Sequence, residues 1–113
     1  MKKNVAIIMG GYSSEYDISI KSGEVVYKTL KNEKKLNLFR IIISKQEWYH
    51  IDDYNKKYEV DKKTFQIVKE KICIKFDLVF NTIHGIPGEN GEIQSYLNSL
   101  NIKQTSSCLL YTS

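Results

Sequence analysis

The sequence predicts an α/β domain of three layers, in which helices cover both faces of a mainly parallel, flavodoxin-like sheet. Apolar runs at residues 4–9, 39–43 and 77–83 have the nearly unbroken character of strands buried on both faces, apart from Asn81 and Thr82. Segments with helical spacing follow the first and third runs, so the strands that they connect are expected to run parallel. The 113 residues, 42% hydrophobic and 27% charged, suit one globular domain with a single core.

The first strand is expected at residues 4–9, and a glycine turn leads from it into a helix that begins near Glu15. Ser14 and Asp17 have the spacing of a capping box, and acidic side chains suit the positive end of a helix. One face of this helix is expected to pack on the sheet, because apolar or small residues recur there at helical spacing: Ile18, Ser22, Val25, Val26 and Leu30.

Residues 45–75 have a different pattern, in which short apolar stretches indicate short strands and hairpins. We expect them to form a small β excursion at one edge of the sheet. The third core strand is followed by a glycine loop and by a helix that ends near residue 100 and buries Ile93, Leu97 and Leu100. Residues 101–105 are expected to return as a short strand, so residues 1–113 form one domain.

The charge and cysteine patterns exclude several classes of protein. The basic residues that give the net charge of +4 are spread along the chain and are almost all lysine, so no nucleic-acid partner is expected. Cys73 and Cys108 have no metal-ligand spacing, which predicts neither a metal site nor a disulfide, and Cys73 is expected to be buried. The apolar run near the amino terminus is too short for a secretory signal, so we expect a cytoplasmic protein with no membrane partner.

Two loops are predicted at the carboxyl ends of parallel strands, where ligands collect in open α/β sheets. They span Gly10 to Ser14 and His84 to Gly91, and both precede helices whose first N–H groups are available to an anion. Neither loop has the glycine spacing of a dinucleotide fold or a P-loop. The second loop turns sharply into its helix, so at least one of its glycines is expected to have a positive φ.

Glu15 and His84 are the candidate binding pair in these loops, since a carboxylate can hold an ammonium group and an imidazole can hold a carboxylate. Together these two groups suit an amino acid. Two simpler roles remain open: Glu15 as a carboxylate that only complements the helix dipole, and His84 as a loop histidine bonded to backbone. Glu89 has the alternative role of bracing the glycine loop, and His50 is expected to be structural.

Residues 9–23, MGGYSSEYDISIKSG, and residues 84–107, HGIPGENGEIQSYLNSLNIKQTSS, resemble the amino-terminal domain of D-alanine–D-alanine ligases, which are ATP-grasp enzymes. The resemblance runs in order along nearly the whole chain, although the middle segment matches only in character. It implies that Glu15 binds the ammonium group of the first D-alanine and that His84 contacts the same substrate region, which makes them the catalytic pair. The substrate-binding set that it implies is completed by Gly10, Gly11, Gly85 and Glu89.

The resemblance also implies that the complete enzyme uses ATP and magnesium to form D-alanyl-D-alanine for peptidoglycan, as a homodimer. The nucleotide and metal ligands lie in central and carboxyl-terminal ATP-grasp domains, which residues 1–113 are expected to lack. This fragment is therefore expected to bind no cofactor and to be inactive alone. Asn90 stands where the family usually has aspartate, a loss of one negative charge. The alternative function is a free-standing, non-enzymatic module that binds a small ligand, because a fold does not determine a function.

Overall fold

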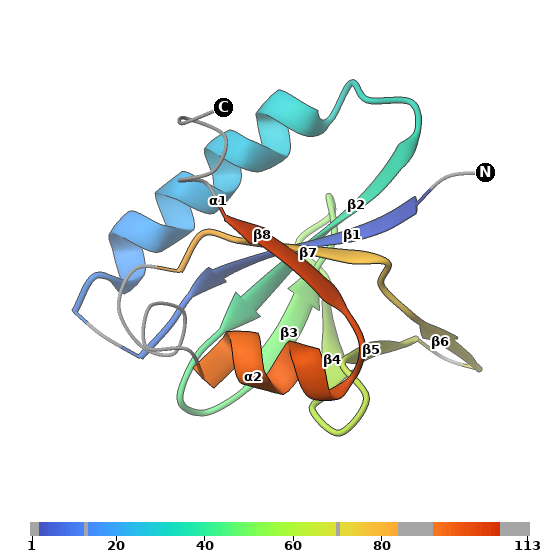
Figure 1. Cartoon of the computed structure of the whole chain (residues 1–113). Coiled ribbons are helices and arrows are strands. Elements are labelled where there is room, and N and C mark those ends of the chain that lie inside the picture. Colours follow the sequence, from blue (N-terminus) through green and yellow to red (C-terminus); the bar gives the residue numbers. More distant parts are fainter. Residues whose placement is uncertain (1–2, 13, 70, 84–91, 107–113) are drawn as a thin grey trace.

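The computed structural model of the chain describes residues 3–12, 14–69, 71–83 and 92–106. These residues form two helices and one eight-stranded sheet (Figure 1), whose strand order is β6-β5-β4-β3-β2-β1-β7-β8. Neither helix of the described part is long and apolar enough to cross a membrane. The sheet has two halves that differ in strand direction.

One half of the sheet is parallel. Its four strands are β2 (Leu36–Ile43), β1 (Lys3–Gly10), β7 (Leu78–Asn81) and β8 (Lys103–Ser106). In the chain, α1 (Tyr16–Leu30) connects β1 to β2, and α2 (Glu92–Ser99) lies between β7 and β8. The predicted strands, their crossover helices and their parallel pairing are confirmed in this half. As expected, α2 buries Ile93 and Leu97 almost completely.

The other half is antiparallel. It consists of β3 (Trp48–Ile51), β4 (Lys57–Asp61), β5 (Gln66–Lys69) and β6 (Ile72–Ile74), and β3 also pairs antiparallel with β2. The prediction of short strands and hairpins in residues 45–75 is confirmed, but the prediction of a mainly parallel sheet is wrong. The links between these strands are too short for a parallel crossover, and the four strands make up half of the sheet.

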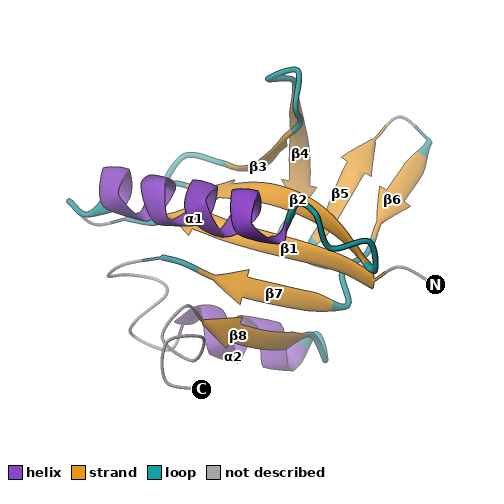
Figure 2. Ribbon diagram, turned by 90° about the horizontal axis from the view of Figure 1, so that it is seen from above, coloured by secondary structure: helices purple, strands orange, loops and turns teal. Residues whose placement is uncertain are grey.

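The two helices lie on opposite faces of the sheet (Figure 2). Alternate residues of β1 point to the two faces: Val5, Ile7 and Met9 pack beneath α1, whereas Ala6 and Ile8 belong to the core that contains α2. Strands β4 to β6 turn away from the direction of β1 and β2, so the sheet curls around α2 (Figure 1, Figure 2). The expected three layers are therefore present around the parallel half.

Only part of the predicted face of α1 packs on the sheet: Val26 and Leu30 contact the core, but two other predicted residues do not. Ile18 and Val25 are 57% and 59% exposed, whereas Ser19 and Gly23 are buried. A Cβ atom at Gly23 would lie 2.6 Å from the Cε atom of Met9, so the absence of a side chain lets the helix approach β1 closely. The helix thus approaches the sheet at a glycine, with Ile20, Val26 and Leu30 packed on the core around it.

Cys73 is also placed differently from the expectation. It is exposed, not buried. It lies on β6, which is the last strand of the sheet and pairs with β5 on one side only. A strand at the edge of a curled sheet has little structure to cover it, which explains the exposure.

Candidate functional site

The turn after β1 is built on two glycines at the carboxyl edge of the sheet. Gly10 and Gly11 have φ angles of 101° and 103°, in the left-handed region that favours glycine. A Cβ atom on Gly10 would lie 2.5 Å from the carbonyl oxygen of Ile43 and 2.8 Å from the Cε2 atom of Tyr16. The amide of Gly11 donates to that same Ile43 carbonyl at 2.7 Å. The turn is thus fixed against the end of β2, and Gly10 has no room for a side chain.

Glu15 occupies the N-cap position of α1. Its φ and ψ angles are −90° and 15°, and no side-chain bond caps the helix, so the predicted capping box of Ser14 and Asp17 is wrong. The helix begins one residue later than that box requires. Glu15 is exposed, and its carbonyl accepts a bond of 3.0 Å from the amide of Ser19. Its carboxylate therefore belongs to the positive end of α1, next to the glycine turn.

Ser19 and Thr82 form a buried polar network that joins β1, α1 and β7. The Oγ atom of Ser19 accepts a bond of 2.9 Å from the amide of Gly10 and donates one of 2.8 Å to the carbonyl of Thr82. Thr82 in turn donates to the carbonyl of Ile8 from its amide, at 3.0 Å, and from its Oγ1 atom, at 2.8 Å. Ser19 is 0% exposed and Thr82 is 2% exposed, so these bonds form away from water.

Sequence reasoning missed this network. It assigned the small residue of the helix–sheet contact to Ser22, three residues after the one that makes the bonds. A partial signal was present, because Thr82 is a polar residue in a strand that is expected to be buried on both faces. Such a residue needs a hydrogen-bond partner, but the sequence does not indicate which helix residue supplies it.

The end of β7 leads toward the second predicted loop. Asn81 is 7% exposed, and its Oδ1 atom accepts a bond of 2.9 Å from the amide of Ile83, which ends the strand. The register pairs Asn81 with Ile8, so β7 and β1 end at the same edge of the sheet. Residues 84–91 lie outside the described residues, and with them the predicted site residues His84, Gly85 and Glu89 and the three loop glycines.

The described part thus brings together Gly10, Gly11 and Glu15, at an edge that β7 shares. That His84 meets Glu15 there stays a prediction. Among the described residues, no group of three His, Cys, Asp or Glu side chains is placed to hold a metal ion.

His50 lies on β3, two strands from β1, and is packed inside the sheet. It is 7% exposed, its Nδ1 atom lies 3.1 Å from the carbonyl oxygen of Arg40, and its ring stacks on Tyr58 with centroids 5.7 Å apart. Removal from water lowers the pKa of His50 below its ordinary value of 6.5, so the neutral form is favoured. These are the properties of the structural histidine that the sequence predicts.

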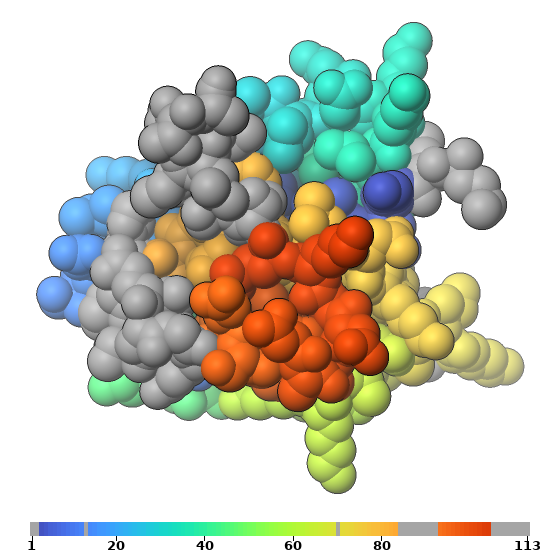
Figure 3. All heavy atoms as spheres, viewed as in Figure 1, coloured from blue at the N-terminus to red at the C-terminus, as the bar shows by residue number. Residues whose placement is uncertain are grey.

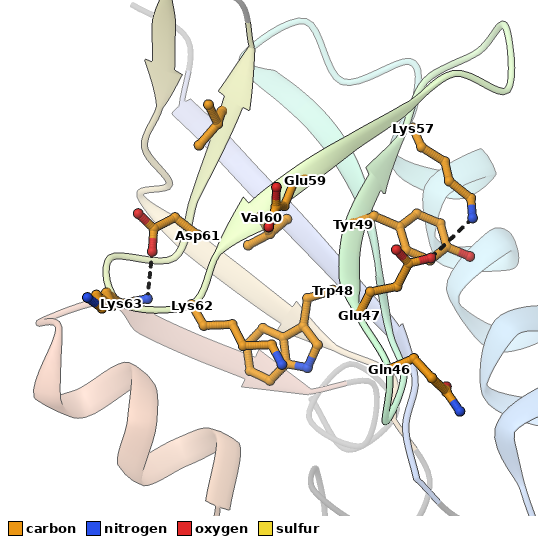
Figure 4. Close-up of a pocket in the computed structure, with 11 residues that line it drawn as sticks. Gln46, Glu47, Trp48, Tyr49, Lys57, Glu59, Val60, Asp61, Lys62 and Lys63 are labelled. Atoms are coloured by element: carbon orange, nitrogen blue, oxygen red, sulfur yellow. Dashed lines mark hydrogen bonds and ion pairs between the residues drawn. The ribbon is translucent and has the colours of Figure 1, made fainter.

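A groove of about 820 Å³ lies on the antiparallel half, and Figure 4 shows the residues that line it. Its charges are mixed and partly paired: Lys57 Nζ lies 3.2 Å from Glu47 Oε1 and 4.5 Å from the centroid of the Tyr49 ring. The lining residues come from β3, β4, β5 and their connections, and they include none of the predicted site residues.

Comparisons with known proteins agree with this architecture. Residues 4–107 match the family described as D-ala D-ala ligase N-terminus. The D-alanine--D-alanine ligase of Christiangramia forsetii is 50% identical over 113 residues, which are 100% of this chain and 34% of that protein. The chain thus spans about a third of the length of such curated relatives.

Two solved structures have the same fold. The D-alanyl-alanine synthetase A of Vibrio cholerae matches with a TM-score of 0.78 and 28% identity, over 92% of this chain and 31% of that one. The VanG D-Ala:D-Ser ligase of Enterococcus faecalis matches with a TM-score of 0.76 and 28% identity, over 92% and 35%. With a family match that extends over nearly all of its residues, the chain belongs to the family of D-alanine–D-alanine ligase amino-terminal domains.

Proposed function

We propose that residues 1–113 are the amino-terminal substrate-binding domain of a D-alanine–D-alanine ligase and form part of the site for the first D-alanine. The observation that carries the proposal is the position of Glu15 at the amino end of α1, beside the glycine turn and at the edge where β1 and β7 end. The complete enzyme joins two molecules of D-alanine with ATP, and it supplies peptidoglycan synthesis in the cytoplasm as a homodimer.

Glu15 is the proposed partner of the substrate's ammonium group. A carboxylate makes a charge-assisted hydrogen bond to an ammonium donor, and such a bond is stronger than one between neutral groups. His84 is the proposed second member of the catalytic pair, and Gly85 and Glu89 belong to the same substrate site.

The two glycines of the first turn contribute through its shape. The amide of Gly10 donates to Ser19 and that of Gly11 donates to Ile43, so both of these N–H groups already have partners within the fold. A side chain at Gly10 would collide with the carbonyl of Ile43. The turn therefore brings the backbone that carries Glu15 to the edge of the sheet, which is a positioning contribution.

ATP and magnesium are proposed for the complete enzyme only. Among the described residues, no group of three His, Cys, Asp or Glu side chains is placed to hold the metal. Central and carboxyl-terminal ATP-grasp domains would hold both. The length of the relatives, of which this chain spans about a third, supports that arrangement.

A chimera tests the proposal: the chain replaces the corresponding third of the Christiangramia forsetii ligase, with which it shares 50% identity. We expect D-alanine-dependent dipeptide formation with kcat within about tenfold of the parent enzyme. In the active chimera, Glu15→Gln should raise the KM for the first D-alanine by about tenfold or more and leave the KM for ATP within about twofold, because an ammonium partner is lost.

Asp17→Asn is the matched control, since it removes one carboxylate from the first turn of the same helix. Both KM values should change less than about twofold in that variant, because a helix-dipole effect alone is small. A folded but inactive chimera would contradict the proposal and favour the non-enzymatic ligand-binding module. If Glu15→Gln and Asp17→Asn change the KM values equally, Glu15 acts only through the helix dipole and does not bind the substrate.

A further inference from the structure

We infer that Ser19 is a positioning residue for the amino-acid site. Its hydroxyl replaces a direct backbone hydrogen bond between β1 and the end of β7, and so it fixes the turn that carries Glu15. The inference rests on the proposed function for its effect on substrate binding. The hydrogen bonds on which it depends belong to the described part of the chain and are independent of that function.

The register of the two strands shows which backbone hydrogen bond the hydroxyl replaces. In a parallel pair, one residue donates to a carbonyl of its neighbour and accepts from the amide two residues further along that neighbour. Thr82 donates from its amide to the carbonyl of Ile8 at 3.0 Å, so its own carbonyl should accept from the amide of Gly10. Instead, Gly10 donates to the Oγ atom of Ser19, and Ser19 donates to Thr82.

A hydroxyl therefore stands between two backbone groups that would otherwise bond directly. It uses its acceptor and its donor at once, at 2.9 Å and 2.8 Å, and it is 0% exposed. The strands must separate at this edge to admit it. Because Ser19 belongs to α1, its hydroxyl also joins the helix that begins after Glu15 to both strands.

Removal of the hydroxyl leaves the buried amide of Gly10 and the buried carbonyl of Thr82 without their partners, and this disturbs the turn. The backbone of Glu15 then loses its fixed position relative to β7. A positioning error of this kind should weaken binding of the amino acid and not of the nucleotide, because under the proposed function other domains hold the nucleotide.

Kinetics of the chimera test the effect on substrate binding. We expect Ser19→Ala to raise the KM for the first D-alanine by about tenfold while the KM for ATP stays within about twofold. Ser99→Ala is the matched control, because that exposed serine bonds the carbonyl of Tyr96 within its own helix. Ile67→Val, a truncation at a fully buried site of the antiparallel half, controls for lost stability. An equal rise of the D-alanine KM in Ile67→Val, or no rise in Ser19→Ala, would overturn the inference.

Amide hydrogen exchange of the 113-residue chain tests the bridging hydroxyl without any activity. In Ser19→Ala the amide of Gly10 should exchange at least about tenfold faster, whereas the amide of Asp77 should not change. Asp77 donates to Asn4 at 2.8 Å, at the other end of the same pair of strands. Ser19→Cys, which keeps a weaker donor and acceptor in a similar volume, is the second variant if Ser19→Ala does not fold, and its effect should be smaller.

The kinetic and hydrogen-exchange experiments together distinguish a failure of the proposed function from a failure of the inference about Ser19. An inactive chimera with the expected exchange result contradicts the proposed function and supports the role of Ser19 in the fold. Equal acceleration at Gly10 and Asp77 indicates global loss of stability and would overturn the inference. An unchanged rate at Gly10 would do the same.

Discussion

The parallel and antiparallel halves of the sheet differ in how they treat buried polar groups. In the parallel half, Ser19 and Thr82 are buried, and they bond to backbone groups at the edge where β1 and β7 end. In the antiparallel half, His50 is buried and its Nδ1 atom lies against the carbonyl of Arg40 within the sheet, the rest of the interior is apolar with several aromatic rings, and charged groups line an open groove. Buried polar bonds specify geometry, whereas aromatic burial contributes stability. If the proposed function holds, the comparison predicts that substitutions in the parallel half affect substrate positioning and substitutions in the antiparallel half affect mainly stability.

An aromatic cluster of Trp48, Phe65 and Tyr96 packs α2 against the antiparallel half. In the sequence, however, this helix lies between two parallel strands. The rings of Trp48 and Tyr96 meet edge to face with centroids 5.3 Å apart, and Phe65 lies 6.0 Å from Tyr96. The hydroxyl of Tyr96 donates to the carbonyl of Lys62, and burial raises the pKa of Tyr96 to about 12. In the space-filling view the orange surface of α2 borders the lime-green surface of the β4–β5 turn (Figure 3).

The strongest test of this comparison is Phe65→Ala. Phe65 is 1% exposed at the centre of the aromatic cluster, so its truncation should lower the free energy of unfolding by about 4 kcal/mol. Its φ of 51° is equally unfavourable for alanine, so no strain is relieved. Urea titration of the chain measures the loss. A chimera with this change should keep its KM for D-alanine, and a large rise in that KM would contradict the division between the halves.

Gly10→Ala should have the next largest effect. The new Cβ atom would lie 2.5 Å from the carbonyl oxygen of Ile43, at a φ of 101°. We expect a loss of about 3 kcal/mol in the free energy of unfolding, from strain and collision together. Asn55→Ala is the control in the antiparallel half, where an exposed residue with a φ of 62° should lose only about 1 kcal/mol. A loss at Gly10 no greater than that at Asn55 would show that the turn relaxes freely.

Arg40→Lys is expected to have an intermediate effect, because Arg40 joins the halves on the face of α1. Its guanidinium bonds Glu24 at 3.0 Å and the carbonyl of Asp52 at 2.9 Å, and it lies 4.9 Å from the centroid of the Tyr27 ring. Lysine cannot reproduce this fork, so unfolding experiments should show a loss of about 2 kcal/mol. The exposed pair of Lys57 and Glu47 provides the contrast.

Lys57→Met should change stability by less than about 0.5 kcal/mol, because water screens that pair. If both substitutions have the same small effect, Arg40 does not join the halves. If Lys57→Met has the larger effect, the groove contributes more to stability than its exposure suggests.

The smallest expected effect is a pH dependence from His50. Burial lowers its pKa in the folded state, so below about pH 6.5 the unfolded chain binds the proton more readily. The contribution of His50 should be complete above that pH and should be lost as the pH falls toward the lower folded pKa. Urea midpoints of the chain and of His50→Gln, compared at about pH 7.5 and about pH 5.5, isolate this residue from the other histidine. Parallel changes in both proteins would mean that His50 does not contribute.

The extent to which the sequence predicts these features follows from the same physics. Apolar runs predict β1, β2 and β7, because burial on both faces requires them, and the helical spacing of Ile93 and Leu97 predicts the buried face of α2. The face of α1 was predictable only in part, through Val26 and Leu30. Its close approach to β1 also depends on the missing side chain of Gly23 and on the hydroxyl of Ser19, which are tertiary contacts.

The candidate site likewise has some features that local sequence predicts and others that only tertiary contacts determine. The two adjacent glycines predict the turn at Gly10 and Gly11, and the structure confirms it with positive φ angles at both. The polar residues before α1 predict the position of Glu15. The bridge through the Ser19 hydroxyl depends on how far β1 and β7 separate at one edge of the sheet, and no local sequence pattern predicts that separation. The pairing of residues 45–75 into half of the sheet is a tertiary feature of the same kind.

The central claim is that Ser19 affects substrate binding through the position of Glu15, and a double-mutant cycle in the chimera tests it most directly. The measurement is the KM for the first D-alanine in Ser19→Ala, Glu15→Gln and the variant that carries both. If each single change raises that KM by about tenfold, independent residues would give about a hundredfold rise together. We predict a double variant within about twofold of Glu15→Gln, because a hydroxyl that positions a carboxylate has little left to act on once the carboxylate is gone. The full hundredfold product would contradict the account.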